Sequence, residues 1–384
     1  MKYLILFFFV LASSIFPQSY YSHLFLPTGF TVESLSGYGY SKTMGGAENI
    51  AAMNPAAIDR FSSPSAGFSY QFETKIDPAY LANMPVKRYR TNIPQSAGLI
   101  LPYRNMRLGI GFTQRYDGDL ILEKVAVTTV ENPDGTGEFM RFEEKADVYR
   151  ISGILSYGVN DLFMEGDRVT AGVSFDYDYI NYFTDRGMAG HAPDFQMKSH
   201  GDKTSAAFGL MYSPSKSTVY SLSYEESVEF SKMKVDSYID NRMYYFIEQP
   251  IGDFAVSREP SRIHLGFDHR FGNQTTLTST LSYVSWNGAI GNRRDRAEAS
   301  FSLIFPVHQL LTVSGGVFYT DYDFTSDTEK AFDLGTKYNA LYLTAGLIFS
   351  WNIIDVNISA GDSHLTGGAY RKHAVARAGA GIHL

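Results

Sequence analysis

The sequence predicts an all-β protein: a fourteen-stranded antiparallel transmembrane barrel of the outer-membrane type with an amino-terminal hatch, or plug, inside it. Three observations predict this fold. The composition combines many aromatic residues with little charge, polarity alternates along most of the chain, and short connections alternate with long ones. We expect a signal peptide over residues 1–19, the hatch over 20–63 and the transmembrane β-barrel over 64–384.

The composition separates this chain from ordinary soluble proteins. Aromatic residues make up 15% of its 384 residues and charged ones only 19%, below the roughly 25% of soluble domains. Such a composition suits strands with one face in lipid and one in water. The net charge of −7 argues against nucleic acid as a partner, because nucleic-acid binders usually carry a basic patch. The absence of cysteine excludes disulfides, thiolate catalysis and cysteine-based zinc sites.

The amino terminus has the pattern of an export signal. Lys2 is followed by the apolar run "YLILFFFVLASS", with small residues at Ala12 and Ser14. We interpret this as a cleaved signal peptide, with a retained helical anchor as the alternative. Later stretches fall short of the ~18 consecutive apolar residues that a transmembrane helix needs.

Side chains alternate at period two from about Ser65 to the end of the chain. In "NALYLTAGLIFSWN", Leu343 and Leu347 fall on one face and Tyr342 and Thr344 on the other. Successive side chains of a strand point to opposite faces, so these segments predict strands with one apolar face. The last strand, "HAVARAGAGIHL", lacks the terminal Phe or Trp common in such barrels. Its predicted outward residues are Ala376, Ala378, Ala380, Ile382 and Leu384.

The connections predict the number of strands. Six short turns follow an aromatic residue, at Tyr103, Tyr157, Tyr212, Phe271, Phe305 and Trp351. Seven long polar stretches separate them, at 76–93, 123–143, 184–203, 233–260, 287–295, 324–338 and 365–372. Seven hairpins give fourteen strands, with short turns on the periplasmic side and long loops outside. An even number of strands closes the sheet without an unpaired edge in lipid.

The segment before the first strand does not alternate and predicts a separate element. "GAENIAAM" is expected to form a short helix with Ile50 and Met53 on an apolar face, and Asn54-Pro55-Ala56 to form a helix boundary or turn. With Gly45 and Gly46, these residues resemble the amino-terminal hatch of the FadL/TodX-type family of outer-membrane long-chain fatty-acid transporters. A PorV-type barrel of the type IX secretion system is similar in the same region and stays as the alternative.

The resemblance implies a function and several candidate residues. It implies passive transport of hydrophobic compounds, long-chain fatty acids above all, through a plugged barrel. Ile50 and Met53 would touch substrate; packing against the barrel wall is the alternative. An inward kink of the third strand, at Asp117-Gly118-Asp119, would open a lateral exit; an ordinary strand end is the alternative. The PorV-like alternative implies a barrel that binds cargo or secretion-system partners with its loops.

Two more groups of residues are candidates for ligand binding. The inward faces carry mixed charges, which predict ion pairs filling the lumen or arginines that receive a carboxylate. The thirteen inward residues are Glu73, Arg115, Arg150, Arg168, Asp176, Asp178, Glu225, Arg262, His264, Asp268, Arg270, Glu298 and Arg377. Arg262 and Arg377 are the candidates for binding a carboxylate. The stretch 233–260 is unusually apolar for a loop and predicts a capture groove or loops packed on one another. Its candidates are Met243, Tyr244, Tyr245, Phe246 and Ile247, with Met188, Phe195 and Met197 of 184–203 as the opposite wall.

The residue patterns do not favour catalysis. Nine histidines are scattered without a spacing that singles out a nucleophile and its base, and no phosphate loop, zinc helix or calcium loop appears. We therefore expect no enzyme, no metal and no cofactor. The expected partners are outer-membrane lipids and hydrophobic or amphiphilic small molecules, bound by a monomer.

Overall fold

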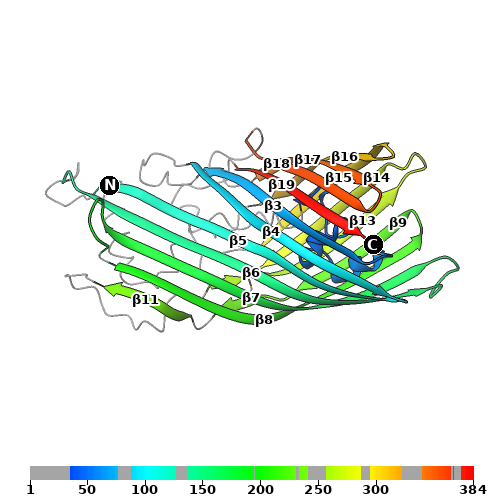
Figure 1. The fold of residues 1–384 in the computed structure, drawn as a ribbon, viewed down its shortest axis with the longest axis horizontal. Helices are drawn as coiled ribbons and strands as arrows, with labels where there is room; N and C mark the ends of the chain where they lie inside the picture. The colour runs from blue at the N-terminus through cyan, green and yellow to red at the C-terminus, as the bar shows by residue number, and fades with distance from the viewer. Residues whose placement is uncertain are drawn as a thin grey trace.

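The computed structural model describes residues 35–76, 88–126, 136–193, 195–230, 233–240, 257–286, 295–321, 340–364, 366 and 373–384. They form an antiparallel barrel that surrounds a short amino-terminal segment (Figure 1). In this part of the chain, no helix is long and apolar enough to cross a membrane.

The barrel has fourteen strands, as predicted, with the seventh and eighth interrupted. The seventh consists of β9, β10 and β11 and the eighth of β12 and β13, while every other strand is one element. The first and last strands pair with each other, and β8 pairs with β9, so the sheet is closed. The strands are β3 (Ser65–Ile76), β4 (Arg88–Tyr103), β5 (Met106–Ala126), β6 (Phe139–Asn160), β7 (Arg168–Met188), β8 (Phe195–Ser215), β9 (Thr218–Glu225), β10 (Val228–Phe230), β11 (Lys234–Asp240), β12 (Ser257–Glu259), β13 (Ser261–Arg270), β14 (Thr276–Ser285), β15 (Arg296–His308), β16 (Leu311–Thr320), β17 (Ala340–Trp351), β18 (Ile354–Asp362) and β19 (His373–His383).

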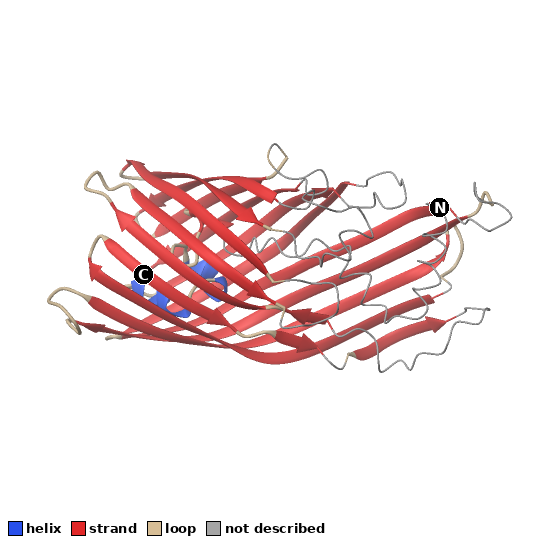
Figure 2. Cartoon of the chain, turned by 180° about the vertical axis from the view of Figure 1, so that it is seen from behind, coloured by secondary structure: helices blue, strands red, loops and turns tan. Residues whose placement is uncertain are grey.

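The six predicted short turns all lie at one end of the barrel, which is also the end that carries the carboxyl terminus (Figure 2). We call it the short-turn end. An aromatic side chain exposed beside a turn is typical of the interfacial girdle of outer-membrane barrels. Exposed aromatic residues of this kind are Tyr103, Tyr157, Phe271, Phe305 and Trp351. The positions of the six predicted short turns are therefore confirmed.

Four predicted loops are shorter than expected. β4 begins at Arg88, within 76–93, and β11 and β12 lie within 233–260. β5 continues to Ala126 and β6 begins at Phe139, although 123–143 was expected to be a loop. In the same way β7 continues to Met188 and β8 begins at Phe195, within the predicted loop 184–203. Both stretches are polar because strands that extend beyond the lipid have water on both faces. Polarity therefore marks the end of the lipid-facing band, and not the end of the strand.

The two faces of the barrel match the predicted alternation. The outer face carries exposed apolar side chains such as Phe175, Phe208 and Ile110, and the last strand exposes Ile382 and Leu384. Eleven of the thirteen charged or histidine side chains predicted to face inward are buried: Glu73, Arg115, Arg150, Asp176, Asp178, Glu225, Arg262, His264, Asp268, Glu298 and Arg377. The other two, Arg168 and Arg270, lie at the short-turn ends of their strands.

Residues 35–63, called the inner segment below, lie inside the barrel near the short-turn end (Figure 2). The segment contains the hairpin β1 (Leu35–Ser36) and β2 (Gly39–Tyr40), then the 3₁₀ helices η2 (Ala47–Ala52) and η3 (Pro55–Arg60). The hairpin contacts β15 to β18, η2 contacts β3 to β6 and β19, and η3 contacts β5 to β8. The segment therefore crosses the lumen from one wall to the other.

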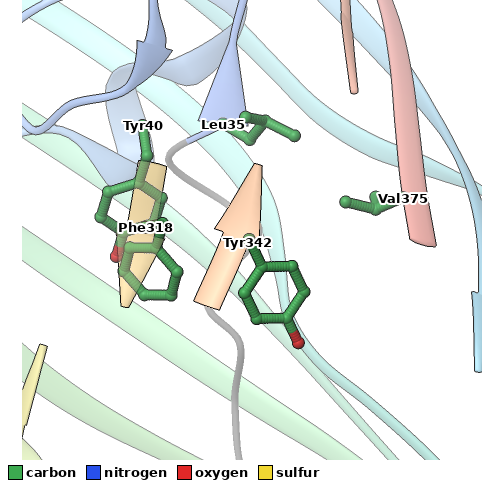
Figure 3. Packing of buried hydrophobic residues seen from close by; sticks show 5 residues of the cluster. All are labelled: Leu35, Tyr40, Phe318, Tyr342 and Val375. Carbon is green, nitrogen blue, oxygen red and sulfur yellow. The ribbon is translucent and has the colours of Figure 1, made fainter. Parts of the chain in front are cut away.

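The hairpin of the inner segment is held by an aromatic cluster. Tyr40 packs on Phe318 of β16 with ring centroids 4.2 Å apart, and Tyr342 of β17 lies next to Phe318 at 6.0 Å. Leu35 and Val375 complete the cluster (Figure 3). Because all five side chains are buried, this contact removes apolar surface from water on the lumenal side of the barrel.

Candidate functional site: inner segment, charge belt and wall opening

The two helices of the inner segment begin where the sequence predicts. Gly46 precedes η2 in an extended conformation. Asn54 caps η3: its side-chain Oδ1 accepts a hydrogen bond from the backbone N–H of Ala56 at 2.9 Å, and Pro55 occupies the first helical position. The Asn side chain satisfies one of the first backbone N–H groups, which have no partner within the helix. Pro at the first helical position has no N–H and therefore leaves none unpaired. The predicted turn at Asn54-Pro55-Ala56 and the predicted short helix are both present.

Polar side chains of the inner segment reach different parts of the wall. Asn54 Nδ2 donates to the carbonyl of Leu222 at 3.1 Å. Asp59 accepts a bidentate pair of bonds from Arg168, at 2.5 and 2.7 Å. Glu48 accepts from Asn357 Nδ2 at 2.9 Å, and its burial raises the pKa of its carboxyl group. These bonds fix the segment at several points around the lumen.

Glycines in the barrel wall let the backbone of the inner segment approach closely. A Cβ at Gly172 of β7 would collide with Pro55 and the backbone N–H of Ala56, and one at Gly98 of β4 would collide with the carbonyl of Ala47. A strand glycine often marks such a close approach of another backbone. The wall is therefore shaped for this segment.

Ile50 and Met53, the predicted substrate contacts, both face the wall. Ile50 is buried with Ile58, Ile100 and Ile154. Met53 packs with Ala56, Ala57 and Met211. Both also line a cavity shared with Arg150 and Glu225, whose volume open to a water-sized sphere is about 10 Å³, the space of roughly one water molecule. This cavity is too small for a hydrophobic ligand in this conformation.

A cluster of buried charges lies next to the inner segment, on the side away from the short-turn end. We call it the charge belt. Its members are Lys42 of the inner segment and Arg115, Arg150, Asp176, Asp178, Glu225, Glu259 and Arg262 of the wall. At its centre, the carboxylate of Glu225 lies 2.9 Å from Lys42 Nζ, 2.9 Å from Arg115 Nη1 and 3.6 Å from Arg262 Nη1. His264 Nε2 lies 3.1 Å from the same carboxylate.

The charge belt is balanced and continues across the lumen. In the described part of the chain, its four cationic side chains face four carboxylates, so each charge has an opposite charge near it. Arg150 binds Asp178 at 2.6 Å and Asp176 at 3.2 Å, and Arg115 reaches Glu259 on the opposite wall at 3.2 Å. Buried charges are tolerated only when they are paired in this way. Lys42 also donates to the carbonyl of Ala52 at 2.9 Å, which joins the belt to the inner segment.

Beyond the charge belt, the lumen wall is apolar again. Val148 and Ile180 face inward and pack with Val228 and Phe230 of β10, which has left β8 to pair with β12. Next to them, Phe195 and Met197 pack with Ala146 and Tyr182. We call these eight residues the apolar strip. Along β6 alone, the order is Ala146 and Val148 in the strip, Arg150 in the belt and Ile154 against the inner segment, so the lumen has three layers.

The barrel wall opens beside the charge belt. β4 pairs with β5 only from Tyr103–Met106 to Ser96–Thr113. Beyond that point β4 remains paired with β3, and β5 remains paired with β6. Among the described residues, Arg88–Gln95 and Gln114–Ala126 therefore have no ladder between them, and we call this gap the wall opening. The Gln95 side chain donates to the carbonyl of Gln114 at 2.7 Å, immediately past the last pair.

A bulge in each strand begins the wall opening. Gln95 is the extra residue between β3 and β4, and Arg115 is the extra residue between β5 and β6. Each bulge turns consecutive side chains to the same side: Gln95 and Ser96 are both buried, as are Thr113, Gln114 and Arg115. A bulge bends its strand and increases the local twist, which separates the two strands here.

The predicted kink of the third strand is displaced in the structure. The bulge lies at Arg115, and Asp117, Gly118 and Asp119 remain paired with Asp147, Ala146 and Lys145 of β6. The Gly between two acidic residues suggested a break, but the ladder between β5 and β6 continues through all three residues. The bulge itself has no sequence signal, because an Arg following a Gln is ordinary in a strand.

The other predicted site residues fall in different places. Arg262 lies in the charge belt, whereas Arg377 donates to the Leu35 carbonyl at 2.8 Å and to Asn49 at 3.1 Å in the inner segment. The structure thus separates the two arginines that the sequence grouped. Phe195 and Met197 face the lumen from β8 and do not lie in a loop. Met243, Tyr244, Tyr245, Phe246 and Ile247 lie outside the described residues.

One serine, one histidine and one aspartate meet at the short-turn end, an arrangement that sequence spacing did not reveal. His383 Nδ1 lies 2.8 Å from Ser65 Oγ, and His383 Nε2 lies 2.6 Å from Asp355 Oδ2. These residues belong to the first strand and the last two strands. Ser65 is only 2% exposed, so its hydroxyl group is not placed to attack a substrate carbonyl. The chain of bonds instead ties the closing strands together.

In comparisons of sequence, no protein-family model and no curated protein matches this chain. In comparisons of structure, it is similar to a Pseudomonas aeruginosa FadL homologue, with a TM-score of 0.62 at 13% identity over 94% of this chain and 99% of that one. The Ralstonia pickettii toluene transporter TbuX gives 0.58 at 13% identity over 93% and 100%. The Pseudomonas putida toluene transporter TodX gives 0.57 at 12% identity over 90% and 95%. The chain therefore has the fold of the FadL-type outer-membrane barrels.

Proposed function

We propose that this barrel transports hydrophobic compounds across the outer membrane by passive diffusion, with long-chain fatty acids as its main substrates. One observation carries the proposal: the wall opens at the level of the charge belt, which separates the apolar strip from the inner segment. Arg115 belongs to both features, because it forms the bulge of β5 and pairs with Glu225 and Glu259. The relatives described as toluene transporters and as a FadL homologue share this fold and support a hydrophobic substrate.

The layering of the lumen suggests the path. A hydrophobic compound held by the apolar strip meets the charge belt below it, which offers it no favourable contact. Passing through the belt would also separate buried ion pairs, a costly step in a medium of low polarity. The wall opening lies beside the belt, and the bilayer is outside it. The compound therefore leaves sideways into the membrane, and the inner segment acts as a hatch that closes the direct route to the periplasm.

The charge belt also suggests how an amphiphile with a carboxylate is handled. Because the belt is balanced, a fatty carboxylate has to replace one of the resident carboxylates. Arg115 is the best placed partner, since its guanidinium group already binds two carboxylates and lies at the wall opening. Arg262 shares Glu225 with it and would compensate for the exchange. The loop residues Met243–Ile247 remain our proposed capture groove.

The lateral exit can be tested by closing the wall opening with a disulfide. The chain contains no cysteine, so Gln95→Cys with Gln114→Cys introduces a unique pair, at two positions already joined by a hydrogen bond. We expect the oxidised variant to lose most uptake of labelled oleate by cells that depend on this protein. Reduction with dithiothreitol should restore it.

A matched control places the same bond where the wall is already closed. Ala97 and Phe112 are directly paired in the β4–β5 ladder, so Ala97→Cys with Phe112→Cys should leave uptake unchanged in both redox states. Equal uptake by the oxidised and reduced Gln95/Gln114 variant would disprove the lateral exit. Comparison of oleate with toluene in the same cells shows whether the carboxylate matters.

The role of the inner segment as a hatch predicts the effect of removing it. Deletion of residues 45–56 removes η2 and the cap of η3 but leaves all barrel strands. We expect a folded barrel that leaks, because the deleted residues fill the lumen against the glycines of the wall. Planar-bilayer conductance measures the leak, and heat-modifiable migration on a gel measures folding. A folded barrel with wild-type conductance would show that these residues do not close the lumen.

A further inference from the structure

The turn between β6 and β7 differs from the other turns of the short-turn end. It presents three consecutive large apolar side chains, Leu162, Phe163 and Met164, which are 52%, 72% and 53% exposed. The turn between β4 and β5 contains only Arg104 and Asn105, and the β13–β14 turn presents Gly272, Asn273 and Gln274. An exposed apolar group of this kind usually marks a contact with a membrane or another molecule.

The apolar turn is held in a defined shape. The carboxylate of Asp167 accepts backbone N–H bonds from Leu162 at 2.8 Å, Phe163 at 3.1 Å and Met164 at 3.1 Å. Asp161, at a positive φ of 55°, accepts from the N–H of Gly166 at 2.6 Å. Since three successive N–H groups bind one carboxylate, the side chains they carry are fixed on the outside of the turn. Because the turn already holds the apolar side chains exposed, binding through them has little further entropic cost.

The turn continues the lipid-facing surface of the barrel. The ring of Phe163 packs edge-on against the ring of Tyr212, with the two ring centroids 5.9 Å apart. Tyr212 stands on the outer face of β8, two residues from Leu210 and four from Phe208, which are exposed on the lipid side. Tyr157, an exposed aromatic residue of the girdle, stands on β6 before the turn. Phe163 is thus directed back toward the membrane and not into the lumen.

We propose that Leu162, Phe163 and Met164 insert into the phospholipid leaflet that surrounds the short-turn end of the barrel. The partner is a lipid surface, because the group is continuous with the lipid-facing band through Tyr212. Amphipathic aromatic and apolar side chains at this level typically lie at the boundary of head groups and acyl chains, ~5–10 Å deep for interfacial segments.

The proposed membrane contact connects to the inner segment. The last residue of β6, Asn160, accepts from Arg168 Nη1 at 2.6 Å across the base of the turn. The same Arg168 holds Asp59 of η3 through its other two nitrogens. A turn anchored in lipid therefore fixes the arginine that fastens η3. The inner segment is tied to the membrane surface through one side chain.

Site-directed labelling tests the insertion. In this cysteine-free chain, Phe163→Cys or Met164→Cys provides a single thiol for a bimane label. Purified barrel is reconstituted into phosphatidylethanolamine and phosphatidylglycerol vesicles that contain doxyl-labelled lipid. We expect strong quenching of bimane at both positions, with a depth of ~5–10 Å below the head groups, and a blue-shifted emission.

Asn105→Cys and Asn273→Cys serve as matched controls in the polar turns of the same end. They should be quenched by aqueous iodide and not by doxyl lipid. If the labels at 163 and 164 behave like those at 105 and 273, the proposal is overturned, and the apolar turn faces water. Because no other protein is present in the vesicles, quenching by lipid cannot come from a protein partner.

Discussion

The barrel has two unlike sides. The strands β5, β6, β7 and β8 have 21, 22, 21 and 21 residues and form the long side. The strands β13 to β19 have 9 to 13 residues and form the short side. On the short side, the ladders β13–β14, β16–β17, β17–β18 and β18–β19 run without a register shift. At the edges of the long side, the wall opening and the departure of β10 from β8 interrupt the pairing.

The two sides of the barrel have different roles: the short side supports the inner segment, and the long side carries the residues proposed to guide a ligand. The short side holds the hairpin of the inner segment through an aromatic cluster, and its ladders are regular except for one register shift between β15 and β16. The long side carries the apolar strip, the arginines Arg115 and Arg150 and the glycine that receives η3. A regular ladder forms a continuous barrel wall, whereas a bulge changes the direction of side chains and bends the backbone. The interruptions are therefore the places where we propose that a ligand passes.

The largest effect is expected at the centre of the charge belt. Glu225→Ala leaves Lys42, Arg115 and Arg262 without their shared carboxylate. Removing one partner of a buried ion pair costs about 3–5 kcal/mol, because the remaining charges stay buried. The midpoint of unfolding in guanidinium, measured in detergent by tryptophan fluorescence, should fall accordingly.

The short side offers a direct comparison for that variant. Glu298 is as deeply buried, but among the described residues it pairs with a single cation, Arg296, at 2.9 Å. Glu298→Ala should therefore destabilise the barrel less than Glu225→Ala. Equal losses in the two variants would contradict the idea that the belt concentrates its charge on Glu225.

A smaller and more local effect is expected where the wall receives the inner segment. In Gly172→Val, the new side chain collides with Pro55 and Ala56. Overpacking of this kind costs about 1–3 kcal/mol, and the inner segment gives way more easily than the strand. Hydrogen exchange of residues 47–60 should accelerate and the barrel should begin to conduct, while the strands keep their protection.

Gly315 on the short side is the matched control. It faces outward, and a Cβ there meets nothing within 4 Å, so Gly315→Val should change neither exchange nor conductance. If Gly172→Val behaved in the same way, the close fit between η3 and the long side would be irrelevant to closing the lumen.

The smallest effect concerns the pH dependence of the inner segment. Burial raises the pKa of Glu48 above its ordinary value of about 4.5, with Arg377 opposing and Asp355 adding to the shift. The folded state favours the neutral form, so docking of the segment is strongest below pH 4.5 and weakens as the pH rises through the raised pKa. Exchange of residues 47–52 should therefore be slower at pH 4 than at pH 7, after correction for the intrinsic rate.

Glu48→Gln should remove this dependence and keep the acceptor for Asn357. A variant whose corrected exchange still changed between pH 4 and pH 7 as in the original chain would assign the dependence to another group.

Much of the fold could be predicted from the sequence because lipid imposes a strict alternation. Outward residues such as Leu343 and Leu347 must be apolar, and aromatic residues must stand at the interfaces, so the fourteen strands and six short turns could be counted. The cap at Asn54 was also predictable, because Asn is a preferred N-cap residue and Pro is favoured at the first helical position. The charges facing the lumen followed from the same alternation.

The arrangement of the site depends on contacts that leave no local signal. Lys42 meets Glu225 across 183 residues of chain. The bulges at Gln95 and Arg115 consist of residues that fit any polar strand, so only the ladder shows them. Arg262 and Arg377 look alike in sequence, yet one lies in the charge belt and the other holds the inner segment. The strand ends were misjudged for a different reason, since strands beyond the lipid are polar on both faces.

Pro94 gives the wall opening a further property. Where β4 and β5 separate, each strand has an unpaired edge. Another chain can add a strand to such an edge. Pro94 has no N–H to offer such a strand, and it stands in β4 immediately before the bulge. In β5, the bulge at Arg115 twists the opposing edge out of register. Both features disfavour the addition of a strand from a second copy at the wall opening.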